Sequence, residues 1–244
     1  MSKLPKAPLI EVIFEIRWTI DINNKEEAQE VQYLHGDLFP LIKSKYPYRE
    51  AANPQMPLEL MMLHSPTHRF RTAANDYPLV QIGPGILTVN TIDAKYFWDD
   101  YEGRIMEALE KLKSVYSFKP HHNVHLVLTY IDLLKFDFQK GDVLKFLEEY
   151  LNISIKQGFY NNQSAAGNVL LVLNYPTEQG SLNLNIGRGK DQKGFDGITI
   201  NTNLVSGNIK PEIPLIKDWL NKSHEVCSGL FKEMTKGKLY ESFK

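Results

Sequence analysis

The sequence predicts an α+β protein, in which antiparallel strands are covered on one face by helices. Residues 9–19 alternate between apolar and polar side chains, which is typical of a half-buried antiparallel strand. Residues 98–115 and 216–234 carry apolar side chains at helical spacing. The order strand, helix, three or more strands, long helix occurs twice along the chain. These observations together indicate an internal duplication of one unit.

Composition limits the class of protein. The chain has 244 residues, of which 43% are hydrophobic and 23% charged, enough for one large or two small domains. Its 28 basic and 29 acidic residues nearly cancel, so the basic excess of many nucleic-acid-binding proteins is missing. Cys227 is the single cysteine, which fits a reducing compartment. Without an apolar run of about 20 residues or an apolar signal core, we expect a cytoplasmic protein that does not enter a membrane.

The first half begins with the strand 9–19, whose apolar face carries Val12, Phe14, Ile16 and Trp18. A helix is expected from Lys25, with inward residues that include Leu34, Leu38 and Leu41, and we expect Gly36 and Pro40 to kink or split it. The Pro- and Asn-rich residues 46–57 indicate a loop. Strands are then expected at 58–64, 68–73 and 79–83, the last running past a Gly83-Pro84-Gly85 turn into 86–91. Asp93 is expected to cap a long helix that ends near Tyr116.

The second half repeats this order of elements. The predicted elements are a long strand at 123–138, a short helix at 142–151, strands at 168–175, 181–187 and 197–204, a long helix carrying Trp219 and a tail helix at 239–243. A polar loop is expected at 158–167. The inward residues of the first strand match Val124, Leu126, Leu128 and Tyr130, so every inward position stays apolar. Two unrelated halves that happen to share an element order are the alternative explanation.

We therefore divide the chain into repeat units at 1–118 and 119–244, joined in one pseudo-symmetric domain. Each unit buries one sheet face under its helices, and two units joined edge to edge would form one curved antiparallel sheet. TATA-binding-protein-like and helix-grip architectures are built in this way. This is an analogy of fold, and it carries no function by itself.

Three motifs resemble a sporadically distributed prokaryotic family of uncharacterised conserved proteins. They are residues 7–17, the strand Leu128-Thr129-Tyr130-Ile131-Asp132, and the helix 219–225 followed by Phe231. The resemblance covers the full length through short motifs, and it implies a gene found in mobile or defence-type neighbourhoods, with no established reaction. In that family the second motif tends to read Arg-Tyr-Ile-Asn. Thr129 and Asp132 replace the Arg and the Asn in this chain.

Histidines and the cysteine give no recognisable catalytic or metal motif. His121, His122 and His125 are clustered, but they lack nearby cysteines or carboxylates to complete a zinc site, and a solvated junction explains them better. His224-Glu225 resembles the start of a zinc-protease motif, yet position 228 is Ser. We expect His224 to act as a cap or to form a hydrogen bond at a contact between helix and sheet, and Cys227 to be a buried structural thiol. No cofactor and no metal are predicted.

Two further clusters have structural explanations. Residues 187–190, Gly-Arg-Gly-Lys, could cradle a phosphate, but the P-loop requires a strand, a longer glycine spacing and a helix. We expect a solvated hairpin loop there. Asp99, Asp100 and Glu102 are adjacent carboxylates at the start of a helix, where they complement the helix dipole.

The most informative pattern is a set of polar residues on the strand faces that point away from the helices. Asparagine is a poor strand former, so its abundance here suggests hydrogen-bonded recognition as well as simple solvation. The predicted binding residues are Arg17, Arg69, Arg71, Gln81, Asn90, Asn183, Asn185 and Asn201, with Thr88, Thr199 and Asn203 on the same face.

These patterns favour a non-catalytic binding protein that recognises a protein partner or a small ligand through its polar sheet face, in a defence-type system. One alternative is nucleic-acid binding across the sheet, with Arg17, Arg69 and Arg71 contacting phosphates. A second alternative is an enzyme of unrecognised type. Exposed sheet edges also make a homodimer plausible.

Overall fold

The computed structural model describes residues 4–21, 23–52, 63–119, 122–156, 158, 166–191 and 194–244. The first half contains β1 (Leu9–Trp18), α1 (Lys25–Ile42), β2 (Tyr48–Ala51), β3 (His68–Arg71), β4 (Leu79–Gly83), β5 (Ile86–Ile92), a 3-10 turn (Asp93–Lys95) and α2 (Trp98–Val115). The second half contains β6 (Val124–Lys135), α3 (Val143–Leu151), β7 (Leu170–Thr177), β8 (Gly180–Lys190), β9 (Asp196–Val205), α4 (Ile213–Thr235) and α5 (Lys238–Ser242). The predicted α+β class is confirmed.

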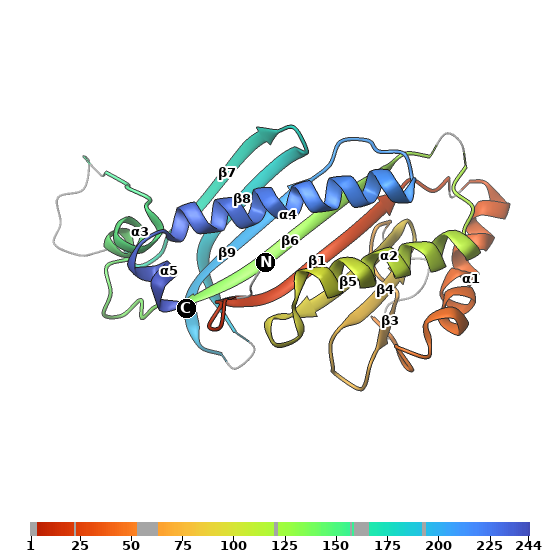
Figure 1. Ribbon diagram of the computed structural model, residues 1–244, viewed down its shortest axis with the longest axis horizontal. Helices are drawn as coiled ribbons and strands as arrows, with labels where there is room; N and C mark the ends of the chain where they lie inside the picture. The colour runs from red at the N-terminus through yellow and green to blue at the C-terminus, as the bar shows by residue number, and fades with distance from the viewer. Residues whose placement is uncertain are drawn as a thin grey trace.

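The described strands form one antiparallel sheet in the order β2-β3-β4-β5-β1-β6-β9-β8-β7. The first strand of each half lies at the centre, flanked by the last strand of its own half (Figure 1). Val12 of β1 pairs with Tyr130 of β6, and Trp18 of β1 pairs with Val124 of β6. In the predicted repeat, Val12 corresponds to Val124 and Trp18 to Tyr130. Exchanging the two halves therefore converts one pair into the other. This is the arrangement that the duplication predicts. Common descent of the two halves remains a prediction.

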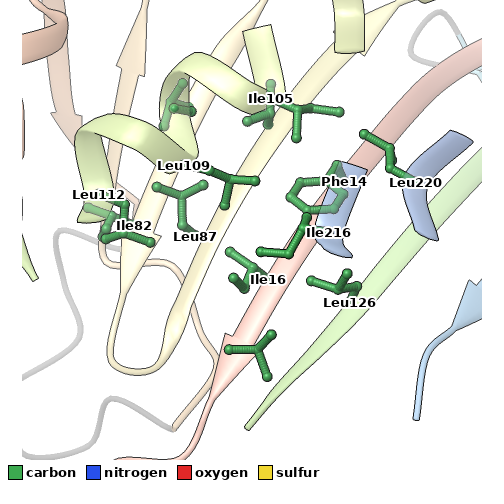
Figure 2. Close-up of a cluster of buried hydrophobic side chains, with 14 of the residues drawn as sticks. Phe14, Ile16, Ile82, Leu87, Ile105, Leu109, Leu112, Leu126, Ile216 and Leu220 are labelled. Carbon is green, nitrogen blue, oxygen red and sulfur yellow. The ribbon is translucent and has the colours of Figure 1, made fainter. Parts of the chain in front are cut away.

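The helices α2 and α4 lie on the same face of the sheet, α2 over the first half and α4 over the second (Figure 1). Between them and the sheet lies a core of fully buried side chains (Figure 2). Phe14 and Ile16 of β1 point into this core together with Leu126 of β6, as the alternation predicts. The opposite face of the sheet therefore carries the polar set.

The helix α1 is continuous from Lys25 to Ile42, so it is not split, and the predicted kink stays a prediction. Pro40 lies in its last turn, where only the hydrogen bond to the Gly36 carbonyl is lost. Ile42 is buried and Leu41 is 41% exposed, which reverses the inward assignment of Leu41.

Two loop boundaries also differ from the prediction. The segment expected to be a loop at 46–57 contains β2, which pairs with β3 at the edge of the sheet. Asp93 opens a 3-10 turn, and α2 begins at Trp98 after Phe97 without a side-chain cap. Residues 58–62 of the strand expected at 58–64 lie outside the described residues, as does most of the loop expected at 158–167.

Residues Gly187 to Lys190 belong to β8, so the predicted hairpin loop at this position is wrong. These residues pair with β9 from Thr199 to Asp196, and the chain reverses only after Lys190. The predicted turn at Gly85 is confirmed. Gly85 has a φ of 67°, and a Cβ there would lie 2.4 Å from the Trp18 carbonyl oxygen, so only glycine fits. Within the described part of the chain, every helix is too short or too polar to cross a membrane.

Candidate functional site

The predicted polar residues do share one face of the sheet, opposite the helices. A row of directly paired residues crosses six strands on this face: Asn90, Ile13, Thr129, Asn203, Asn183 and Asn174. The two halves thus contribute to one continuous surface. Whether this surface binds a partner depends on how many of its polar groups are already engaged.

In the first half these groups hydrogen bond one another. Nε of Arg69 donates to Oε1 of Gln81 (2.9 Å), and Nε2 of Gln81 donates to Oγ1 of Thr88 (3.0 Å). Nδ2 of Asn90 donates to Oε1 of Glu11 (2.8 Å). Thr88 and Asn90 are buried. Several donors and acceptors of this face therefore already bind one another.

The second half repeats this behaviour across the paired strands. Nδ2 of Asn203 donates to Oγ1 of Thr129 (2.9 Å), and Nδ2 of Asn183 donates to Oδ1 of Asn203 (3.2 Å). Asn185 and Asn201 face each other on neighbouring strands. Oδ1 of Asn201 is buried and has no hydrogen-bond partner among the described residues.

The predicted arginines are likewise engaged within the chain. Arg17 forms an ion pair with Glu15 (2.6 Å), and Arg71 forms one with Glu50 (2.7 Å). Arg71 is only 9% exposed. Phosphate binding by these arginines would have to compete with existing partners.

A cavity of about 160 Å³ lies on the other face of the sheet, beneath the helices. Its walls come from β6 and β9, the 3-10 turn and the residues that follow it up to Trp98 at the start of α2, the second half of α4, α5, and residues 4–9. Two backbone hydrogen bonds hold this N-terminal segment in place. Lys6 N donates to the Phe243 carbonyl (3.0 Å), and Leu133 N donates to the Pro8 carbonyl (2.9 Å).

Asp132 is the most unusual residue of this cavity. Alternation along β6 places it on the helix-facing side, where it is 5% exposed. Its carboxylate has no hydrogen bond or ion pair within the described part of the chain. Burial, and then the negative charge of Asp93, raise the pKa of Asp132 from 3.8 to about 7. A buried carboxylate without a partner is rare, because burial penalises its charge.

Beside Asp132, two tyrosines and a histidine form a hydrogen-bonded chain. Oη of Tyr130 lies 3.2 Å from Oη of Tyr96 and 2.8 Å from Nδ1 of His224. The His224 ring stacks on Trp98, with ring centroids 3.7 Å apart. Burial lowers the pKa of His224 to about 4, so the ring is neutral at pH 7. The predicted hydrogen bond between this helix and the sheet is confirmed.

Cys227 also lines the cavity, and its character matches the prediction of a buried thiol. It is 3% exposed, and burial raises its pKa to about 12. A thiol that stays protonated at neutral pH is a poor nucleophile. Among the described residues, no group of three or more His, Cys, Asp or Glu side chains is placed to hold a metal ion.

The other histidines lie away from this cavity. His122 is buried, with its Nε2 3.4 Å from Oε1 of Glu27 on α1. His125 is on the open sheet face, directly opposite Arg17. His121 lies outside the described residues. The structure therefore does not bring His122 and His125 together.

The sequence did contain a signal for the cavity. Asp132 is a charged residue at an inward position of a strand whose other inward residues include Leu126, Leu128 and Leu134. Such a violation of the apolar pattern is expected at functional or strained sites. Tyr96, Phe97 and Trp98, by contrast, could not be distinguished from core residues by spacing alone.

Comparison of the chain with protein-family models, with curated proteins and with solved structures gave no match.

Proposed function

We propose that the protein binds a small molecule in the cavity beneath α2 and α4, and that its function is binding and not catalysis. The observation that carries this proposal is the buried, unpartnered carboxylate of Asp132 at the wall of a largely apolar cavity. Small-molecule sites typically combine apolar walls with a few polar groups that fix orientation. Asp132 would supply that orientation, and the rings of Tyr96 and Trp98 would supply the walls.

The open sheet face is the weaker candidate for recognition. Its arginines and several of its amides already have intramolecular partners, for example Gln81 with Thr88 and Asn203 with Thr129. Binding there would require exchange of these bonds. The net gain per exchanged hydrogen bond is small.

An enzyme is the second candidate, because Asp132 has a pKa of about 7. A carboxyl group with that pKa suits proton transfer at neutral pH, and perturbed groups of this kind cluster in active sites. Two features favour binding over catalysis. Cys227 is protonated, and the Tyr130–His224 hydrogen bond occupies Nδ1 of the neighbouring imidazole.

A homodimer through the edge strand β7 is compatible with either function. Leu170 and Val172 of this strand are 72% and 65% exposed. Exposed apolar side chains on an unpaired edge favour strand-to-strand association. The substitution Val172→Lys should shift such a dimer toward monomer in light-scattering measurements, whereas Lys190→Glu, a charge change on β8, serves as the comparison.

The proposed function is tested by analysing protein purified from its native host. The protein is denatured, and the small molecules that it releases are identified by mass spectrometry. We expect a near-stoichiometric molecule from the wild type and its loss from Ser228→Phe, which fills the cavity. Ser114→Phe adds the same ring at an exposed position of α2 and should retain the molecule.

Two experiments together can refute the proposal: the release of a bound molecule from the native protein, and the titration of the purified protein with small neutral probes. The proposal fails if neither of them shows binding that Ser228→Phe abolishes. Turnover of the released molecule by the wild type, lost in Asp132→Asn, would instead favour the enzyme.

A further inference from the structure

We infer that the ligand of this cavity is a small organic ammonium ion, with its cationic head at Asp132 and a short apolar body among the aromatic rings. This inference rests on the proposed function, since it names the ligand class of the same site. It is carried by the charge and the ring content of the wall.

The negative charge of the cavity wall favours a cationic ligand. Asp132 and Asp93 both line the cavity, and the negative charge of Asp93 disfavours the ionised form of Asp132. The described part of the chain offers Asp132 no cation and no hydrogen-bond donor. A positively charged head placed at Asp132 would satisfy the carboxylate through a charge-assisted hydrogen bond and relieve this repulsion.

The aromatic rings of the cavity wall also favour a cationic ligand. Tyr96, Phe97, Trp98, Tyr130, Phe231 and Tyr240 all line the cavity. The face of an aromatic ring attracts a cation, and clusters of aromatic rings are a known way to hold organic ammonium groups. A neutral apolar ligand would explain the rings but leave Asp132 unused.

The other polar side chains of the cavity wall disfavour an anionic ligand. Among the described lining residues, the one lysine is Lys232, and its side chain is exposed on α4. The imidazole of His224 is neutral at pH 7, because burial lowers its pKa to about 4. An anionic ligand would therefore meet two carboxylates in the wall, with the exposed Lys232 as the one lysine among the described lining residues.

Size limits the body of the ligand. A cavity of about 160 Å³ is comparable to an engineered cavity of about 150 Å³ that accepts benzene. The head and body together should therefore contain only a handful of non-hydrogen atoms.

The test uses three probes with one four-carbon body: n-butylammonium, butan-1-ol and butyrate. Each is titrated into the purified full-length protein at pH 8, above the pKa of Asp132, and followed by NMR shifts of the indole N–H groups. We expect n-butylammonium to bind at least about tenfold more tightly than butan-1-ol, and butyrate to bind most weakly. Asp132→Asn should remove the preference for the ammonium probe and leave the affinity for the alcohol within about twofold.

Asp137→Asn is the matched control, because it makes the same change at an exposed position outside this cavity and should keep the preference. Equal or tighter binding of butan-1-ol or butyrate by the wild type overturns the inference, and this comparison does not depend on any variant folding. Binding of the alcohol alone would leave the proposed function intact. Binding of none of the probes, together with no released molecule from the native protein, would defeat both.

Discussion

Tyr130 on the central strand β6 and His224 on α4 are joined by a 2.8 Å hydrogen bond between Oη and Nδ1. This bond ties the longest helix to the middle of the sheet at the wall of the cavity. The same hydroxyl lies 3.2 Å from Tyr96, so one atom connects three elements of the fold. Removing the Tyr130 hydroxyl should therefore disturb all the contacts that it makes.

Tyr130→Phe should lower the free energy of unfolding by about 1–3 kcal/mol. The change leaves Nδ1 of His224 and Oη of Tyr96 without their shared partner in a buried setting, where an unsatisfied polar group costs about that much. Urea unfolding followed by circular dichroism measures the difference. Tyr175→Phe, at a side chain that is 43% exposed, should change the stability by less than about 0.5 kcal/mol. Equal effects of the two substitutions would contradict the structural role of Tyr130.

Asp132→Asn should change how stability depends on pH. Between about pH 4 and pH 7 the folded Asp132 keeps its proton while the unfolded residue loses it, because the pKa is raised from 3.8 to about 7. Unfolding then releases a proton, so the contribution of Asp132 to stability falls as the pH rises through this window. The stability of the variant relative to the wild type should therefore increase from pH 4 to pH 7, by on the order of 4 kcal/mol.

His224 acts in the opposite direction over part of the same window. Its pKa is lowered from 6.5 to about 4, so between these values unfolding takes up a proton and stability falls as the pH falls. The two residues offset each other in the wild type below about pH 6.5. In Asp132→Asn, the pH dependence of stability that His224 contributes is no longer offset by that of Asp132. Urea titrations at several pH values measure both slopes, with the exposed-site variant Asp137→Asn for comparison. A difference between Asp132→Asn and wild type that stays constant with pH would refute this assignment.

Two leucines on α4 provide a matched test of the core. Leu220 is fully buried between α4 and the sheet, whereas Leu215 on the same helix is 46% exposed. Leu220→Ala should cost about 2–5 kcal/mol, because it removes buried surface and leaves a cavity. Leu215→Ala should cost less than about 1 kcal/mol. Denaturant unfolding of both variants measures the contrast, and similar costs would mean that α4 does not cover the sheet as described.

The amide row on the open face should contribute to stability. Asn203 accepts from Asn183 and donates to Thr129, so Asn203→Ala removes two hydrogen bonds at once. We expect a loss of about 1–2 kcal/mol in the free energy of unfolding. The variant Asn168→Ala, at an exposed position before β7, serves as the control. If Asn203→Ala is instead neutral for stability but abolishes binding of a partner, the sheet face is a recognition surface after all.

Much of the fold follows from local patterns in the sequence. The alternation in residues 9–19 identifies β1 and the side that faces the core, because successive side chains of a strand point to opposite faces. The spacing of Ile105 and Leu112 in the same way identifies the buried side of α2. Two local signals misled. Pro40 is tolerated because it lies in the last turn of α1, and residues 187–190 extend β8 because β9 pairs with them.

The candidate site, like the fold, follows partly from the sequence and partly from the tertiary structure. The sequence by itself placed His224 at a contact between helix and sheet and Cys227 on the apolar side of the last helix. Asp132 was not among the predicted site residues, although the alternation of its strand continues inward from Tyr130 to Asp132. Only the tertiary structure decided that the start of α2, the second half of α4 and residues 4–9 enclose a cavity there, and that Asp132 has no partner within the described chain. The physical reason is that alternation and helical spacing fix where a side chain points. Which distant segments it meets depends on how the two halves of the sheet join and how the helices pack across them.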